Sequence, residues 1–320
     1  MQKSNTPLPS HLKDFLDWID VEKGLSSKTQ ENYARFIKRF FDWLKTTNLS
    51  SLKPHELTAD HIWKYRIFLA RQTRSRRRGK KPLEKSTQNY YLIALRSLLS
   101  YFAERDIVSL PMDKIKLVRD KGDPEVRFLT IEQLEKLFSI PDVQTPAGLR
   151  DRTILETFFS TGMRISELAA LNRDQVETSL KSDFLELGIV GKGGRARTVY
   201  FSKAVLSWVK KYLETRHDTD EPLFVNFRSP KNSSRRLSVR TIEKIMKRYA
   251  LQAGLPENTT PHVLRHSFAT DLLNKGVDIR ILQEFLGHKS ITATQIYTHV
   301  TSKKLREIHK KFHGTTMTND

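Results

Sequence analysis

Four segments in the C-terminal half of the chain concentrate basic, hydroxyl and imidazole side chains of the types that bind phosphate. In the first, TGMRISEL at residues 161–168, Gly162 permits a tight turn and Arg164 lies where a helix is predicted to begin. A helix N-terminus beside an arginine favours an anion. Glu167 follows three residues later on the same helical face, so it is placed to orient the guanidinium of Arg164. An ordinary surface Arg–Glu pair is the alternative interpretation.

The second segment is GKGGRAR at residues 191–197. Its glycines would let the backbone approach a phosphate, and Lys192, Arg195 and Arg197 supply three cations around them. It is not a P-loop, because the GKS/T ending is missing and no helix follows at once. The segment therefore predicts a basic turn that contacts an anion such as DNA phosphate.

The third segment, PHVLRH at residues 261–266, places His262 and Arg265 three residues apart on one face of a predicted helix. His262 and His266 lie four apart, a spacing that raises the alternative of a zinc site. A zinc-protease helix needs a glutamate directly after its first histidine, and Val263 stands there instead. We therefore expect no metal at this helix.

The fourth segment runs from LGHKS, which contains His288, to Tyr297. Tyr297 alone would fit a buried aromatic beside neighbouring isoleucines as well as a nucleophile. The four segments together supply cations, acids and a hydroxyl, which is what a metal-free phosphodiester reaction requires. No carboxylate cluster indicates a Mg²⁺ site, so we expect neither a metal nor another cofactor.

The composition favours a nucleic-acid partner. The 320 residues include 56 Lys and Arg against 36 Asp and Glu, a formal net charge of +20 that is spread over both halves. A polyanion relieves such self-repulsion, although a solvated basic surface is the alternative. There is no cysteine, which excludes disulfides and thiolate metal sites. The absence of a long apolar run or signal-like N-terminus predicts a cytoplasmic protein that does not bind membranes.

Apolar periodicity predicts only helices in the first 115 or so residues, beginning near residues 12, 27, 58 and 86. One connection, residues 71–81, carries seven cations and no acid. It is predicted to bind DNA, with a solvated loop or a nuclear-localisation-like patch as alternatives. The residues predicted to contact phosphate there are Arg74, Arg76, Arg77, Arg78, Lys80 and Lys81.

The polar residues 118–127, which include Gly122 and Pro124, predict a linker. Thr130 and Gln133 then form a capping-box pattern at the start of a helix. Apolar residues 184–190, the glycine-rich turn and residues 198–201 predict a β-hairpin. Further helices are predicted at about 203–215, 238–253, 262–274, 277–286 and 290–298.

These motifs resemble one known family. The segment PHVLRHSFATDLLNKGVDIRILQEFLGHKSITATQIYTHVT, residues 261–301, resembles the active-site region of tyrosine recombinases of the phage integrase family, most of all the Xer type. TGMRISELAALN and GKGGRARTVYFS resemble its two earlier motifs, and SSKTQENYARFIKRFFDWL is similar to its core-binding domain. The resemblance covers nearly the whole chain, with all six expected positions occupied.

The resemblance implies a mainly α fold with a small β-hairpin (α+β), arranged as a two-domain C-shaped clamp. Residues 1–117 would be a helical, SAM-like core-binding domain and 118–127 the linker. Residues 128–301 would be the catalytic domain, and 302–320 a tail that docks on a neighbouring protomer or, alternatively, a frayed basic terminus.

The resemblance also implies a role for each matching residue. Tyr297 would attack a scissile phosphate to leave a 3′-phosphotyrosyl link and a free 5′-hydroxyl. Arg164 and Arg265 would hold the non-bridging oxygens, and Lys192 would protonate the leaving oxygen. The remaining implied roles are general base or acid for His262, a phosphate hydrogen bond for His288 and support of Arg164 for Glu167.

The implied activity is site-specific DNA recombination through a Holliday junction, resolving chromosome or plasmid multimers during cell division. The implied partners are double-stranded DNA at a specific recombination site, a homo- or hetero-tetramer on that DNA, a paralogous recombinase and a DNA translocase. The alternatives are an integrase of a mobile element, a topoisomerase-like nicking and closing enzyme, and a non-catalytic architectural DNA-binding protein.

Overall fold

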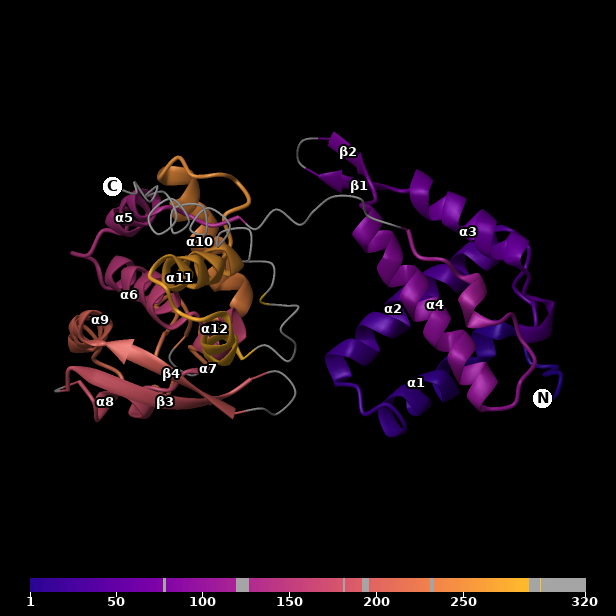
Figure 1. Ribbon diagram of the computed structural model, residues 1–320, viewed down its shortest axis with the longest axis horizontal. Helices are drawn as coiled ribbons and strands as arrows, with labels where there is room; N and C mark the ends of the chain where they lie inside the picture. The colour runs from indigo at the N-terminus through magenta and orange to yellow at the C-terminus, as the bar shows by residue number, and fades with distance from the viewer. Residues whose placement is uncertain are drawn as a thin grey trace, which may run out of the picture. The chain divides into compact units, whose positions relative to one another are not determined.

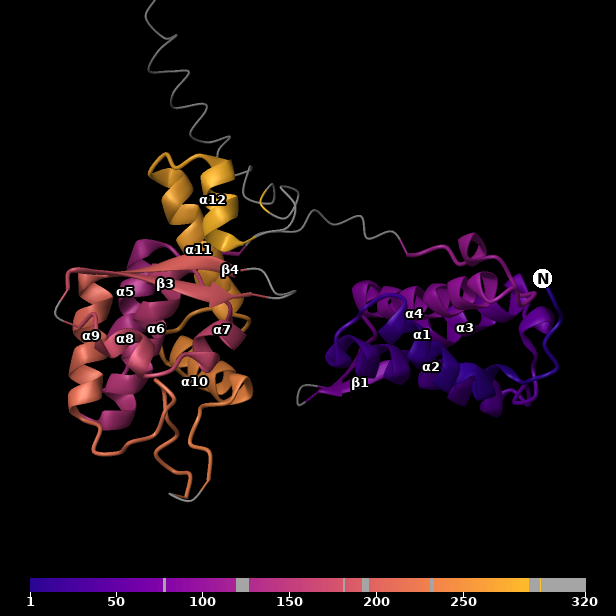
Figure 2. The same ribbon diagram turned by 90° about the horizontal axis from the view of Figure 1, so that it is seen from below.

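The computed structural model describes residues 1–76, 79–118, 127–180, 182–191, 196–230, 233–287 and 294, with backbone alone for 74–76 and 79–81. The chain forms two compact units, Met1–Asp123 and Pro124–Asp320 (Figures 1 and 2). The division falls inside the segment predicted as a linker. The predicted mainly helical fold with a small β-hairpin is confirmed. Among the helices described, none combines the length and apolar composition needed to cross a bilayer.

In the described part of the N-terminal unit, four α-helices surround an aromatic core. They are α1 (Leu12–Val21), α2 (Ser27–Thr46), α3 (Ala59–Arg71) and α4 (Lys85–Glu104), with 3₁₀ turns at Leu8–His11, Pro54–Glu56 and Met112–Lys114. Phe40 packs edge-on against Tyr65 from α3, and Trp18 packs edge-on against Tyr101 from α4. These ring contacts join helices that the apolar spacing in the sequence predicted separately.

The prediction that this unit contains helices alone is wrong. Strand β1 (Thr73–Arg76) pairs antiparallel with β2 (Gly79–Pro82), which sets Arg74 opposite Lys81 in the register. The basic run at residues 71–81 is therefore mostly a β-hairpin. Its charged sequence has no alternation of apolar and polar residues, so it lacked the pattern by which strands are predicted.

The C-terminal unit is larger and carries the predicted hairpin. Its elements are α5 (Ile131–Ser139), α6 (Pro146–Thr161), α7 (Ile165–Ala170), α8 (Asp174–Glu177), β3 (Phe184–Val190), β4 (Ala196–Ser202), α9 (Lys203–Glu214), α10 (Val239–Gln252), α11 (Pro261–Asn274) and α12 (Ile279–Leu286). The strands pair antiparallel from Phe184 opposite Ser202 to Val190 opposite Ala196. The predicted hairpin is confirmed, and so is the capping box of Thr130 and Gln133.

Helix α6 is the central element of this unit. It contacts α5, α9, α11 and β4, and most of its residues are buried (Figure 1). Its buried threonines are tolerated because each hydroxyl donates to the carbonyl one turn earlier: Thr153 to Leu149, Thr157 to Thr153 and Thr161 to Thr157, at 2.8, 2.8 and 2.6 Å. A helix with several threonines in its sequence can therefore be buried in the core.

The helices predicted around α9, α10, α11 and α12 are confirmed, with small shifts of their ends. Helix α12 begins at Ile279, two residues later than predicted, because Asp278 caps it by accepting from the backbone N–H of Arg280 at 2.7 Å. The helix predicted at 290–298 lies outside the described residues except at Thr294.

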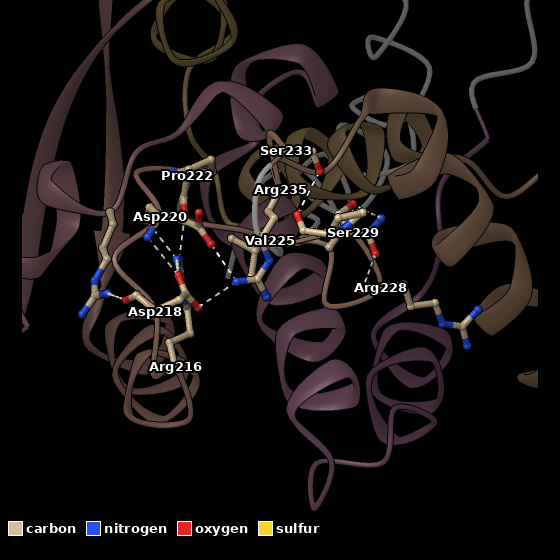
Figure 3. Close-up of polar contacts among 12 residues, drawn as sticks. Arg216, Asp218, Asp220, Pro222, Val225, Arg228, Ser229, Ser233 and Arg235 are labelled. Carbon is tan, nitrogen blue, oxygen red and sulfur yellow. Dashed lines mark hydrogen bonds and ion pairs between the residues drawn. The ribbon is translucent and has the colours of Figure 1, made fainter.

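Arginines organise the irregular segment between α9 and α10 (Figure 3). The guanidinium of Arg216 is fully buried, pairs with Asp218, and donates to the carbonyls of Asp220 at 2.9 Å and Pro222 at 2.6 Å. Arg235 pairs with Asp220 at 2.7 Å. Backbone carbonyls that lack strand or helix partners are satisfied in this way, which fixes the conformation of the segment.

Candidate active site

Arg164 stands at the N-cap of α7, as its sequence position predicted. Its backbone N–H donates to Glu167 Oε2 at 2.7 Å, and its Nη1 donates to Oε1 of the same carboxylate at 3.0 Å. The contact expected from the three-residue spacing is present. Glu167 therefore caps the helix and orients the arginine with one side chain.

A second arginine completes the environment of Glu167. Arg197, near the start of β4, donates from Nη1 to Oε1 at 2.8 Å and from Nη2 to Oε2 at 2.6 Å. Burial raises the pKa of Glu167, but the hydrogen bonds from Arg197 and from the Arg164 backbone outweigh it, so the pKa falls to about 2. The carboxylate is consequently ionised at neutral pH.

Arg265, on α11, joins two parts of the site that are distant in the sequence. Its Nη1 donates to the carbonyl of Gly162 at 2.6 Å, and its Nη2 donates to the carbonyl of Leu286 at the end of α12. Only 5% of Arg265 is exposed. The arginine of the third motif is thus fixed between the first motif and the helix that leads into the fourth.

The C-terminal end of α12 is where the three arginines meet. Its last carbonyls lack partners within the helix and carry the negative end of the helix dipole. Three consecutive carbonyls each accept from a different arginine: Phe285 from Arg197 at 3.2 Å, Leu286 from Arg265, and Gly287 from Arg164 at 3.2 Å. His288 is the next residue in the chain.

Gly287 is suited to its place by size and backbone angle. Its φ is +60°, in the left-handed region, and a Cβ there would lie 2.7 Å from Cδ of Arg197. A larger residue would therefore displace the arginine.

The environment of His262, which lies three residues before Arg265 on α11, favours the neutral imidazole. Its pKa is lowered by desolvation and by the positive charges of Arg265 and Arg164, against a smaller opposing effect of Glu243. His266 behaves likewise: burial, His262 and Arg265 lower its pKa to about 4. A neutral His262 beside two arginines has the protonation state of a proton acceptor.

The structure brings together Arg164, Glu167, Arg197 and Arg265, with His262 on the same helix as Arg265. The other residues of the predicted catalytic site, together with three of the predicted DNA contacts, fall outside the described residues: Lys192, Arg195, His288, Tyr297, Arg77 and Arg78. For Arg74, Arg76, Lys80 and Lys81 only the backbone is described. These assignments stay predictions.

Sequence reasoning missed two features of the site. Arg197 was predicted as a DNA contact, yet all three of its hydrogen bonds described above go to Glu167 and Phe285. The role of the α12 carbonyls was not foreseen either. Thirty residues separate Arg197 from Glu167, and no periodic pattern marks a pair at that distance.

Comparison with known families covers both units. Residues 127–304 match the model of the phage integrase family, and residues 12–109 match the phage integrase N-terminal SAM-like domain. The first match alone spans more than half of the chain.

Curated relatives align over nearly their whole length. The chain is 35% identical over 306 residues to the tyrosine recombinase XerD of Listeria monocytogenes, covering 94% of this chain and 98% of the relative. It is 35% identical over 312 residues to the tyrosine recombinase XerD of Corynebacterium glutamicum, covering 94% and 97%.

Solved structures share the fold. The XerH site-specific recombinase bound to a palindromic difH substrate, a post-cleavage complex, matches with a TM-score of 0.68 and 23% identity, covering 97% of this chain and 91% of that one. The Tn1549 transposon integrase in complex with transposon right end DNA matches with a TM-score of 0.68 and 19% identity, covering 94% and 99%.

Proposed function

This chain belongs to the phage integrase family and is a site-specific tyrosine recombinase, and we propose that its reaction runs through Tyr297. The phenolic oxygen of Tyr297 attacks the scissile phosphorus and loses its proton, and the bond from phosphorus to the 5′-oxygen breaks. A 3′-phosphotyrosyl ester and a 5′-hydroxyl result. Attack by the 5′-hydroxyl of a partner strand reverses the step, so the bond energy is conserved and no nucleotide is consumed.

The side chains of the site divide the work. A tyrosine phenol has a pKa near 10, so it reacts at neutral pH only if its proton is accepted and the charge on the phosphate is stabilised. His262, held neutral, accepts that proton, and Lys192 returns one to the leaving oxygen. Arg164, Arg265 and His288 bind the non-bridging oxygens.

The observation that carries this proposal is the convergence of Arg164 and Arg265 on adjacent carbonyls, those of Gly287 and Leu286. Two guanidinium groups from separate motifs are thereby fixed within one site. The two residues whose carbonyls they contact directly precede His288 in the chain. Fixed cations suit the developing negative charge of a phosphoryl transition state, because they need not reorganise during the reaction.

The proposal extends to the partners of the reaction. The substrate is double-stranded DNA at a specific site, bound in the cytoplasm by four protomers that pass through a Holliday junction. The net charge of +20 supports a DNA partner. The likeness to the tyrosine recombinase XerD supports a Xer-type enzyme. For that type the sequence resemblance implies the resolution of chromosome or plasmid multimers, with a paralogue and a translocase as further partners.

The test is a nicked suicide duplex, from which the cleaved strand diffuses so that the covalent complex accumulates. Purified wild type and Tyr297→Phe are incubated with the duplex from the candidate recombination locus and separated on a denaturing gel. An adduct formed by wild type alone is expected. Adduct from Tyr297→Phe would overturn the nucleophile assignment.

A pool of duplexes with random sites is assayed in parallel, so that a wrong locus does not pass for inactivity. Salt-sensitive binding without an adduct on any duplex would favour the architectural alternative. Relaxation of supercoils without a target sequence would favour a topoisomerase-like enzyme.

A further inference from the structure

We propose that Arg197 is a positioning residue of the recombination reaction. It fixes Arg164 and the end of α12 relative to the β3–β4 hairpin, whose connecting segment contains Lys192 in the sequence. The proposal rests on the proposed function. It assigns Arg197 a place inside the protein's own hydrogen-bond network in place of a contact to DNA.

The geometry around Glu167 is the first argument. Each oxygen of that carboxylate accepts one bond from Arg164 and one from Arg197, at distances of 2.6 to 3.0 Å. The side chains of Glu167 and Arg197 are 5% and 9% exposed. A bidentate pair that is buried to this extent has little freedom to turn toward a phosphate on the surface. Of the hydrogen bonds that the described residues give to this carboxylate, removing Arg197 would leave those from Arg164.

The third bond of Arg197 links this pair to α12. Its Nε donates to the carbonyl of Phe285 at 3.2 Å, while the neighbouring carbonyls of Leu286 and Gly287 accept from Arg265 and Arg164. Gly287 packs on the arginine stem, where a Cβ would meet Cδ at 2.7 Å. Arg197 therefore contacts both the carboxylate that orients one phosphate-binding arginine and the helix end that precedes His288.

The position of Arg197 in the hairpin is the second argument. It is the second residue of β4 and pairs in register with Ile189 of β3. Lys192 lies five residues before it in the sequence. Arg197 is therefore at the turn end of the hairpin, and its bonds fix that end of the two strands to Glu167 and to the last turn of α12.

The experiment compares wild type, Arg197→Ala, Arg197→Lys and Arg152→Ala on the suicide duplex. Arg152 is a matched control in the same unit: it gives two bonds to Glu156, at 2.9 and 2.6 Å, and one to the carbonyl of Phe138, but takes no part in the site. Two quantities are measured, the rate of adduct formation at saturating protein and the dependence of the DNA dissociation constant on salt. Circular dichroism establishes the temperature below which each variant is folded.

We expect Arg197→Ala to slow adduct formation about 10- to 100-fold, the usual cost of losing an orienting partner. The salt dependence of binding should match wild type, because no phosphate contact is lost. Arg197→Lys keeps the positive charge but loses the planar guanidinium with its paired N–H donors. Its rate should therefore lie between the rates of wild type and Arg197→Ala. Arg152→Ala should react at the wild-type rate.

Any of the following outcomes would overturn the proposal. One is a wild-type rate from both Arg197 variants. Another is a salt slope reduced by about 0.9, the signature of one lost phosphate contact, with an unchanged rate at saturation. If Arg197→Ala does not fold, the rate of adduct formation by Arg197→Lys decides, because the salt slope of a variant that keeps the charge would not change. Failure of wild type itself to form an adduct overturns the proposed function and this inference together, whereas an adduct from wild type with unchanged variants overturns this inference alone.

Discussion

Arg265 donates a 2.6 Å hydrogen bond to the carbonyl of Gly162, 103 residues earlier in the chain. Gly162 ends α6 with a φ of +57°, and Arg164 follows two residues later at the start of α7. The turn that positions Arg164 is therefore held by Arg265, the other arginine proposed to bind phosphate. Such mutual support means that a change at the turn should disturb both arginines at once.

Gly162→Ala tests this coupling. An added Cβ would lie 2.4 Å from a ring carbon of Phe268, which is on α11 one turn after Arg265. Because the left-handed backbone alone costs roughly 1–2 kcal/mol and overpacking adds about 1–3 kcal/mol, we expect a loss of stability of about 2–5 kcal/mol. Adduct formation should also fall at least 10-fold at temperatures where the variant is folded. Urea unfolding and the suicide-duplex assay measure the two effects.

Gly254→Ala is the control for backbone strain. Gly254 has a φ of +67° in the same unit, but the nearest atom to an added Cβ is Nζ of Lys136 at 3.7 Å. It should lose roughly 1–2 kcal/mol of stability without slowing the reaction. Equal effects of the two substitutions on the rate would contradict the coupling.

The features predicted from the sequence are those with local patterns. The N-cap position of Arg164 and its contact with Glu167 follow from a three-residue spacing, and the capping box at Thr130 follows from another. The hairpin at residues 184–202 was predicted from apolar runs around a glycine-rich turn. Each of these signals lies within about twenty residues.

The features that were missed depend on contacts between distant segments, or on charged residues that do not alternate with apolar ones. Arg197 meets Glu167 and Phe285 across 30 and 88 residues, and no residue in between marks that pairing. The strand pair at residues 73–82 is rich in cations and poor in the β-branched and aromatic residues that favour strands, so no strand was predicted there. Similarly, the buried threonines of α6 satisfy their hydroxyls within the helix, which composition alone does not reveal.

Asp151 is expected to be a major determinant of the stability of the C-terminal unit. It is 1% exposed and accepts from Arg150 at 2.6 Å, from Arg248 at 3.1 Å and from the hydroxyl of Tyr249 at 2.9 Å. Asp151→Ala would leave the buried Arg150 without its carboxylate, so we expect a loss of about 3–5 kcal/mol in the free energy of unfolding. Urea titration followed by circular dichroism measures it.

The matched control for Asp151 is Asp183→Ala. Asp183 pairs with Lys203 at 2.9 Å, and both side chains are 75% exposed. Its removal should change stability by less than about 0.5 kcal/mol, because exposed ion pairs contribute little. A comparable loss from both substitutions would refute the assigned importance of burial.

Glu167 should make the stability of the protein depend on pH in the acid range. Its pKa is about 2 in the folded protein and higher in the unfolded chain, where an ordinary glutamate has about 4.3. A depressed folded pKa stabilises the protein above the unfolded value, and that contribution is lost as pH falls through about 4 toward 2. It amounts to roughly 3 kcal/mol at neutral pH.

The measurement is the free energy of unfolding of wild type and Glu167→Gln between pH 2 and pH 7. The difference between the two should be largest near neutrality and shrink as the wild-type carboxylate takes up its proton. Asp218→Asn removes another carboxylate whose pKa is lowered to about 2. Comparing the double variant with the two single variants shows whether the two carboxylates contribute additively to the pH dependence of stability. A difference that stays constant over the whole range would exclude the assigned pKa.

The histidines of α11 provide the last prediction. Desolvation is the largest cause of the lowered pKa of His262 and of His266, and the charge of Arg265 contributes to both. NMR titration should therefore find both imidazoles neutral at pH 7, with His266 titrating near pH 4. Arg265→Gln should raise both pKa values while leaving them below 6.5, since burial remains. A His262 that is protonated at pH 7 in wild type could not accept the proton of Tyr297, and the base would have to be sought elsewhere in the site.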